Sequence, residues 1–432
     1  MYVQVVVVLA AMVISYAVAA RKFSVEISLL AMAIVGGIVG ALWKTPPITD
    51  LGRHLVEGSA TYLDMILIFT TATIFMEIVK ASGGVDFFVR ATLRRFHDRR
   101  VIVLCLLLVL ILVPGALTGA GSVSLLVVGA PVALALRHLG ISKRRVAAIL
   151  FVTAGLSAAC PPVNIWAMIV CAGTAIPYVG FEIPLLIPVL GLGLFTMFFL
   201  GWKGTAAEWK TMEKELQKPP EGMNWWRMLL PFLVFFALVV SSRIWPFALP
   251  ILGLPLQFVI SALIALLVSP VKIDIVELAQ VTVKRLLPLL STVVIVGVVL
   301  QIMTATGVRG LFAYLSIMTP LTLLFILLAF IVPLSEGVLT YGGAAVLGIP
   351  LTWYINSLGY HPTIAIAGLS LLWALGDALP PTALIGRLSV MVAGFEGKYW
   401  DFLRSTAVPW VIITIVGILM VVFSSQLSFL VL

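Results

Sequence analysis

Charged residues are scarce in this 432-residue chain: Asp, Glu, Lys and Arg make up 10% of it, whereas 62% of the residues are hydrophobic. A water-soluble globule of this size needs more polar surface than so few charges can supply. Apolar runs of roughly 20 residues, the length that crosses a bilayer, recur from Val3 to the end of the chain. The sequence therefore predicts an integral membrane protein that crosses the lipid bilayer many times and has no separate water-soluble domain.

Cysteine and histidine are also rare, with three and four residues respectively. Cys105, Cys160 and Cys171 lie in apolar stretches without the spacing of a zinc site or a disulfide framework, so we interpret them as packing residues. The sequence contains neither a nucleotide-binding loop nor a zinc-protease motif. These features predict that the chain is not an enzyme and needs no cofactor.

The net charge of +9 does not indicate nucleic-acid binding, because the basic residues fall in short segments between apolar runs and not on one exposed face. Cytoplasmic loops of membrane proteins collect Lys and Arg. With the N-terminus outside, the basic segments around Arg21, Arg94 and Arg144 all fall inside, as does the polar stretch after Lys203. We therefore expect a protein of a bacterial-type cytoplasmic (inner) membrane with both termini outside. The first apolar run is expected to be a retained span.

The apolar runs fall into two halves of the same rhythm. We expect residues 1–203 to form the first repeat, 204–227 a cytoplasmic linker, and 228–432 the second repeat. In each half, three spans precede a region broken by glycine and proline, and one more span follows it. The predicted spans are about 2–19, 24–43, 60–80, 184–203, 228–245, 250–268, 286–304 and 403–430, and the broken regions are 101–176 and 317–395.

The two broken regions repeat each other in constant register. Pro114 and Pro333, and the double prolines that begin at Pro161 and Pro380, are each separated by 219 positions, which indicates an internal duplication. If each broken region forms a re-entrant hairpin and one interrupted span, each half crosses the membrane five times, and the second half must be inserted upside down. The predicted fold is an all-α polytopic membrane protein with two inverted repeats, about ten spans, two re-entrant hairpins and discontinuous helices.

Polar residues interrupt the apolar runs at corresponding places in the two halves. A double proline inside a span frees backbone carbonyls, which must then face protein, water or an ion. Half-helix N-termini that meet near the midplane favour a small anion, and carbonyls with hydroxyls favour sodium. The alternative is that Gly and Pro merely kink packed helices. The predicted substrate- and ion-binding residues are Thr118, Gly121, Ser122, Ser124, Pro161, Pro162, Asn164, Glu336, Thr340, Gly342, Gly343, Asp377, Pro380, Pro381 and Thr382.

Two acidic residues, Glu336 and Asp377, lie within the breaks of the second half, where an isolated charge is expensive. We expect them to coordinate a coupling ion or to carry a proton. The alternative is that each caps a half-helix or pairs with a nearby base. Arg387 could meet an anionic substrate or extend to the inner interface. A sodium site is predicted near Ser122, Asn164, Gly342 and Asp377.

At these residues the sequence resembles the ion transporter superfamily, most closely the large membrane subunit of TRAP-type transporters. Three passages carry the resemblance: Phe75 to Gly83, Gly119 to Pro162, and Gln301 to Pro381. The resemblance implies an elevator mechanism, in which a transport domain from 101–176 and 317–395 slides against a scaffold made of the remaining spans. It also implies sodium-coupled uptake of organic acids.

The leading hypothesis is therefore a secondary active transporter that takes up a small organic anion, such as a carboxylate or dicarboxylate. Its coupling ion would be sodium or a proton, and the chain would be a TRAP-type large permease subunit or a stand-alone relative. An ion or proton antiporter, or an anion channel of the same superfamily, is the alternative. A small membrane subunit, a soluble substrate-binding protein and a second copy in a homodimer are the partners to test; no nucleic-acid partner is expected.

Overall fold

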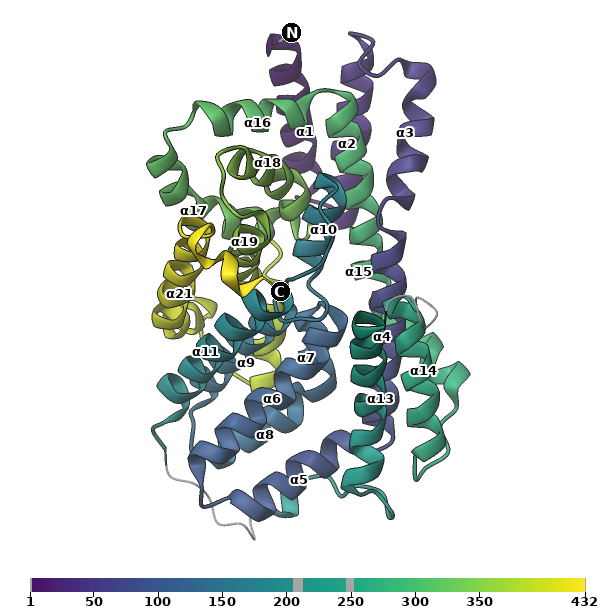
Figure 1. Ribbon diagram of the computed structural model, residues 1–432, viewed down its shortest axis with the longest axis vertical. Helices are drawn as coiled ribbons and strands as arrows, with labels where there is room; N and C mark the ends of the chain where they lie inside the picture. Colours follow the sequence, from purple (N-terminus) through teal and green to yellow (C-terminus); the bar gives the residue numbers. More distant parts are fainter. Residues whose placement is uncertain (1, 205–212, 246–251, 432) are drawn as a thin grey trace.

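The computed structural model describes residues 2–204, 213–245 and 252–431 (Figure 1). Residues 205–212 of the predicted linker and the first two residues of the predicted span 250–268 lie outside the described residues. Within the described ranges the chain forms helices and turns without a β-strand. The first half contains α1 (Tyr2–Ala19), α2 (Val25–Ala41), α3 (Ile48–Ala60), α4 (Leu63–Ala81), α5 (Gly84–Phe96), α6 (Arg100–Thr118), α7 (Gly121–Ser124), the π-helix η1 (Leu125–Gly129), α8 (Ala130–His138), α9 (Lys143–Ala158), α10 (Ile165–Thr174) and α11 (Glu182–Gly201). The second half contains α13 (Trp225–Ile244), α14 (Leu254–Val268), α15 (Ile275–Ala305), α16 (Val308–Met318), α17 (Leu321–Leu339), the π-helix η2 (Ala344–Gly348), α18 (Ile349–Ser357), α19 (Pro362–Gly376), α20 (Leu384–Ala393), α21 (Tyr399–Val422) and the short η3 (Gln426–Leu430).

Seven helical segments of the described chain are long and apolar enough to cross a bilayer. The longest of them, Ile48–Ala81, joins α3 and α4 over 34 residues. Shorter apolar helices, α1, α2, α13 and α14 among them, accompany these segments. A helix satisfies its backbone hydrogen bonds internally, as the hydrocarbon core requires. The prediction of an all-α, multi-pass membrane protein is confirmed.

The broken regions of the two halves share several element boundaries. The π-helices η1 and η2, the helices α8 and α18, and the helices α10 and α20 each begin and end 219 positions apart. Both double prolines, Pro161-Pro162 and Pro380-Pro381, contain a cis peptide bond. The separation of 219 positions that relates the prolines of the two halves therefore also relates these helix boundaries. The inverted insertion of the second half stays a prediction.

The helices pack in two groups. In the first, here called the α15 group, α2, α3 and α4 pack along α15, and α1, α13 and α14 pack on these helices. In the second, the α9 group, α6, α11, α20 and α21 pack on α9, while α17 and α21 pack on α19. Figure 1 shows α5 and α16 running across opposite ends of the molecule. α5 contacts α4 and α6, one helix of each group, whereas α16 contacts α1 and α15 of the α15 group and also α18, which packs on α19.

The packing bears on the predicted division into two domains. α11 and α21, which the sequence analysis placed in the scaffold, contact α9 and α19 extensively. They therefore belong to the α9 group by contact. Which group moves and which stays fixed remains a prediction.

Two predicted spans begin at other residues in the structure. The span predicted from about residue 60 is preceded by α3, which is amphipathic: Leu51 and Gly58 are buried, whereas Arg53 is exposed. The span predicted from 286 begins at Ile275, because the Asp274 carboxylate accepts hydrogen bonds from the backbone N–H groups of the first turn at 3.0 and 3.1 Å. An aspartate in this position stabilises a helix start.

Two further differences concern helices that were not predicted and the end of the last predicted span. α5 and α16 were not predicted as helices, because with 13 and 11 residues neither contains an apolar run long enough to cross a bilayer. The predicted span 403–430 ends as a helix at Val422, where the polar pair Ser424 and Ser425 interrupts the apolar run. The Ser425 hydroxyl donates to the carbonyl oxygen of Gly359 at 2.9 Å and fastens this end of the chain.

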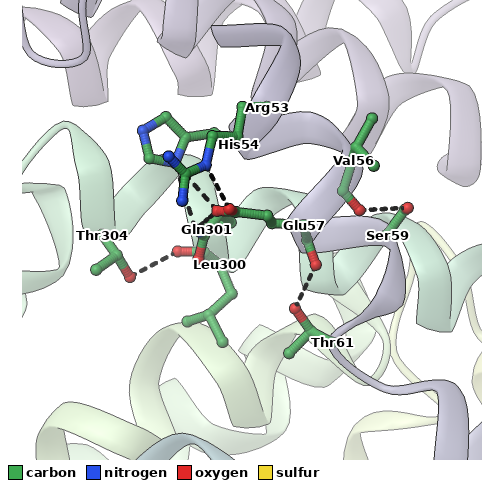
Figure 2. Close-up of polar contacts among 9 residues, drawn as sticks. All are labelled: Arg53, His54, Val56, Glu57, Ser59, Thr61, Leu300, Gln301 and Thr304. Atoms are coloured by element: carbon green, nitrogen blue, oxygen red, sulfur yellow. Dashed lines mark hydrogen bonds and ion pairs between the residues drawn. The ribbon is translucent and has the colours of Figure 1, made fainter. Parts of the chain in front are cut away.

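The α15 group contains a close helix crossing. A Cβ atom added to Gly297 of α15 would lie 2.3 Å from the carbonyl oxygen of Gly58 in α3, so the crossing has no room for a side chain. One turn further along α15, the Gln301 amide nitrogen lies 3.2 Å from a Glu57 carboxylate oxygen and 3.3 Å from Nδ1 of His54 (Figure 2). Membrane helices associate in this way, through small residues supplemented by polar side chains.

We expect Gly297→Ala to lower the stability of the purified protein by about 1–3 kcal/mol, because the added methyl group forces α3 and α15 apart. Thermal unfolding in detergent, followed by circular dichroism, measures the loss. Gly191→Ala in α11 is the matched control, since a Cβ at Gly191 meets no atom within 4 Å, and it should leave the midpoint unchanged or slightly higher. Equal midpoints for the two variants would contradict the close crossing.

Candidate functional site

The first hairpin tip is held against α9. α6 ends at Thr118, whose hydroxyl donates to the Pro114 carbonyl at 2.7 Å, and the chain turns at Gly119 with a φ of 70°. A Cβ at Gly121 would lie 2.2 Å from the Ala154 carbonyl oxygen, so only glycine allows this contact with α9. The Ser124 hydroxyl lies 3.0 Å from that of Ser157. Thr118, Gly121 and Ser124 therefore fix the tip.

The first double proline is followed by a capped half-helix. Asn164 is fully buried and begins α10: its side-chain oxygen accepts from the Ala167 N–H at 3.0 Å, and its amide group donates to the Ala159 carbonyl at 3.3 Å. The Val163 N–H donates to the Ala116 carbonyl at 3.1 Å, which ties the break to the hairpin. The Asn164 side chain therefore closes the interruption from both sides.

The second hairpin tip turns at Thr340, which has a φ of 53° and a hydroxyl bonded to the Leu339 carbonyl at 2.7 Å. Gly343 packs closely on Ser335, since an added Cβ would lie 2.6 Å from the Ser335 hydroxyl. Gly342 lies elsewhere: an added Cβ would be 3.4 Å from the Val296 side chain of α15. The tip thus contacts the α15 group through Gly342.

The second double proline is tied to the second hairpin in the same manner as the first. Thr382 donates to the Gly337 carbonyl through both its N–H, at 3.2 Å, and its hydroxyl, at 2.9 Å. Asp377 ends α19 and its backbone carbonyl accepts from the Gly386 N–H at 3.1 Å. Pro380 and Pro381 are exposed, and the Pro381 carbonyl accepts from Arg387 at 3.0 Å. Arg387 therefore satisfies a backbone carbonyl of the double proline that precedes it.

Tyr341 connects the two tips. Its hydroxyl donates to the Gly119 carbonyl at 3.4 Å, and its ring packs on Trp166 and Phe69 with centroid distances of 5.8 and 6.0 Å. The sequence analysis did not select Tyr341, although it lies inside the predicted tip. The sequence signal that could have identified Tyr341 is its aromatic side chain in a stretch that is otherwise rich in glycine.

A cavity of about 380 Å³ opens where these segments meet the α15 group. From the predicted residues it brings together Ser122, Thr340, Asp377 and Thr382. The opposite wall comes from the start of α2 and the middle of α15 and supplies Glu26, Arg285 and Thr292. The Thr292 hydroxyl donates to the Glu26 carboxylate at 3.4 Å. The structure therefore gathers hydroxyls, carboxylates and one guanidinium around a space of small-molecule size.

Arg285 was not predicted as a site residue, because the sequence places it in a basic segment that resembles any cytoplasmic loop. In the structure its guanidinium lines the cavity and lies 3.8 Å from the Glu77 carboxylate of α4. Lys80, three residues after Glu77, donates to the Leu126 carbonyl of η1 at 2.6 Å. Glu77 and Lys80 of α4 therefore each contact another helix.

Glu336 lies behind the cavity wall. It is 1% exposed, and within the described part of the chain its Oε2 has no hydrogen-bond partner. Asp377, 6% exposed, lines the cavity on the adjoining segment. The two predicted acids are close enough to interact electrostatically, with Trp166 beside Glu336.

The predicted site residues thus separate by position. Ser122, Thr340, Asp377 and Thr382 line the cavity, and Glu336 lies behind Asp377. The others fix the tips and breaks by packing or hydrogen bonds, or lie at the double prolines. Of the four residues predicted to lie near sodium, Ser122 and Asp377 line the cavity, whereas Asn164 caps α10 and Gly342 faces Val296. Sodium binding by these residues stays a prediction.

No protein-family model matches the sequence, and no curated protein matches it either. The structure is similar to the crystal structure of the YdaH transporter of Alcanivorax borkumensis, which is described as having an unusual topology. The TM-score is 0.56 at 13% sequence identity, over 88% of this chain and 88% of that chain. At this identity the likeness shows the fold alone: the chain shares the fold of a multi-pass membrane protein whose description is that of a transporter.

We expect Asn164→Ala to destabilise the protein by about 1 kcal/mol, because the first turn of α10 loses its cap. Asn164→Ser, which keeps a capping oxygen, should recover most of the loss. Both are measured as shifts in the thermal unfolding midpoint. Asn224→Ala is the matched control, since Asn224 caps α13 from an exposed position. If Asn164→Ala unfolded at the wild-type midpoint, the capping role would be wrong.

Proposed function

We propose that the protein is a secondary active transporter that takes up a small organic anion, such as a carboxylate or dicarboxylate, coupled to sodium or protons. The observation that carries this proposal is the cavity formed by both hairpin tips and the second break. Its volume suits a small molecule, and Ser122, Thr340 and Thr382 supply hydroxyl groups. Paired helix interruptions of this kind form substrate sites in secondary transporters.

Arg285 is the residue that supports a negatively charged substrate. Of the residues that line the cavity, it is the one basic side chain, and its ion pair with Glu77 is long enough, at 3.8 Å, to be exchanged for a ligand. A guanidinium binds a carboxylate through two parallel hydrogen bonds. An anionic ligand held by Arg285 and the tip hydroxyls is therefore the best fit.

An elevator movement is supported by the two helix groups. The cavity lies between them, so a shift of the α9 group along the α15 group would carry a ligand bound at the tips. At opposite ends, α5 contacts both groups, and α16 connects the α15 group to α18, which packs on α19. These two helices would act as the connecting arms. A TRAP-type large permease subunit, or a stand-alone relative, would have this arrangement.

The cavity lies beside residues of the predicted inner side. Glu26 follows the basic pair Arg21 and Lys22, and Arg285 follows Lys284. If Lys and Arg mark the cytoplasmic side, the cavity opens toward the cytoplasm and the protein is in its inward-facing state. This orientation is consistent with the proposal of a cytoplasmic-membrane protein that has both termini outside.

Uptake by purified protein in proteoliposomes tests the function. We expect labelled mono- or dicarboxylates to accumulate when an inward sodium or proton gradient is imposed. Arg285→Gln should raise the KM about tenfold, equivalent to about 1.4 kcal/mol of binding energy, because the carboxylate loses its guanidinium partner. Lys284→Gln is the matched control: Lys284 is exposed and does not line the cavity, so its KM should equal that of the wild type.

Equal KM values for Arg285→Gln and the wild type would mean that the anion site does not lie in this cavity. Glu77→Gln separates the role of Arg285 from that of its ion pair, since it frees the guanidinium without removing it. If Glu77→Gln and Arg285→Gln raised the KM alike, the ion pair and not the substrate contact would be responsible. Absence of gradient-driven uptake of every anion tested, with folded protein in the vesicles, would contradict a stand-alone transporter.

A further inference from the structure

Glu336 and Asp377 are two carboxyl groups that approach each other with little else of charge around them. The segments that carry them are in direct contact: a Cβ at Gly376 would lie 2.5 Å from the Cβ of Glu336, and one at Gly337 would lie 2.7 Å from the Cβ of Leu379. Within the described residues, neither carboxyl takes part in an ion pair of 4.0 Å or less. The pair therefore lacks a basic partner.

The titratable groups that face the pair are few. Tyr341 of the second tip interacts electrostatically with both carboxyls. Tyr399 of α21 interacts with Asp377, and its hydroxyl donates to the neighbouring Ala378 carbonyl at 2.8 Å. α10 contributes Trp166, which does not titrate. Across the cavity, the α15 group contributes Glu26 and Arg285.

Two ionised carboxylates in these surroundings would be costly. Burial of a charge without a partner is strongly unfavourable in a protein interior, and a second negative charge nearby adds to that cost. Glu336 is sealed from solvent, and its Oε2 has no partner in the part of the chain described here. The pair must therefore hold at least one cation or proton.

A sodium ion fits these surroundings poorly. Hard cations are bound by several oxygen ligands, and the carbonyls of this break already have donors: Gly337 accepts twice from Thr382, Ala378 accepts from Tyr399, and Asp377 accepts from Gly386. A proton binds to one carboxylate oxygen and needs no such set of oxygen ligands.

We propose that Glu336 and Asp377 form a proton-coupling pair that shares one proton, which enters and leaves through Asp377 and the cavity. This inference rests on the proposed function and names its coupling ion. The proton binds a carboxylate oxygen of Asp377 from the outer solution and is released to the cytoplasm from the same group. Glu336, behind the wall, makes the doubly ionised pair unfavourable and so keeps the proton in place during the movement.

The coupling to the substrate is electrostatic. An ionised Asp377 repels an anion in the cavity that it lines, whereas a protonated Asp377 does not. Protonation therefore strengthens anion binding, and anion binding strengthens protonation by the same factor. Proton and anion enter together and leave together, which is symport.

Asp377→Asn tests the pair because the amide imitates the protonated carboxyl. In proteoliposomes, the wild type should accumulate the anion when the outside is more acidic than the inside, without sodium. The variant should no longer accumulate the anion on this gradient, and its exchange of labelled for unlabelled anion should lose the dependence on external pH that the wild type shows. Asp377→Glu should restore accumulation. Asp64→Asn is the control, since Asp64 is exposed at the start of α4, and it should behave as the wild type.

Glu336→Gln provides a second readout. With a neutral residue behind it, Asp377 no longer meets a like charge, so half-maximal uptake should shift to more acidic external pH. A wild type that exchanges the anion but accumulates it only on a sodium gradient would overturn the proton pair while leaving the transporter intact. Proton-driven accumulation by Asp377→Asn would also overturn it. A folded wild type that exchanges no anion would contradict the proposed function and this inference with it.

Discussion

Backbone carbonyls in the hydrocarbon core must find a donor, and the rest of this structure depends on how they do so at four interrupted helices. Each double proline removes donors from a span. The donors are replaced from within the protein: Val163 supplies one to Ala116, Asn164 to Ala159, and Thr382 two to Gly337. Tyrosine hydroxyls satisfy further carbonyls, Tyr178 at Pro162, Tyr399 at Ala378 and Tyr341 at Gly119. The interruptions are thereby rigid, and the tips that rest on them are placed with fixed geometry.

This way of closing the breaks also determines what remains for a ligand. Most freed carbonyls are already occupied, so side chains, and not unwound backbone, are the groups available in the cavity. Those side chains are the hydroxyls of Ser122, Thr340 and Thr382, the carboxylate of Asp377, and the guanidinium of Arg285 on the facing helix. A small anion with a proton on Asp377 fits this set.

Much of the fold was predictable from the sequence because its signals are local. Apolar runs predicted the spans, and the constant separation of the prolines predicted the matching boundaries of η1 and η2. α5 and α16 were missed because amphipathic helices that lie across the ends of the bundle have no long apolar run. The roles of Asn164 and Arg387 were not predicted for another reason. A helix cap, and a hydrogen bond from Arg387 to a carbonyl of the nearby double proline, depend on backbone geometry that residue spacing does not reveal. Arg285 and Glu26 reach the cavity only through tertiary packing, since each is separated from the breaks by many residues.

The most direct test of the central claim, that both tips enclose one anion site, is thiol labelling in a chain whose three native cysteines are replaced. Ser122→Cys and Thr382→Cys come from different halves and line the same cavity. A transported anion should slow the reaction of both with a membrane-permeant maleimide, and it should leave Thr49→Cys on exposed α3 unchanged. If saturating anion supported transport while both cavity cysteines reacted at their original rates, the site would lie elsewhere in the protein.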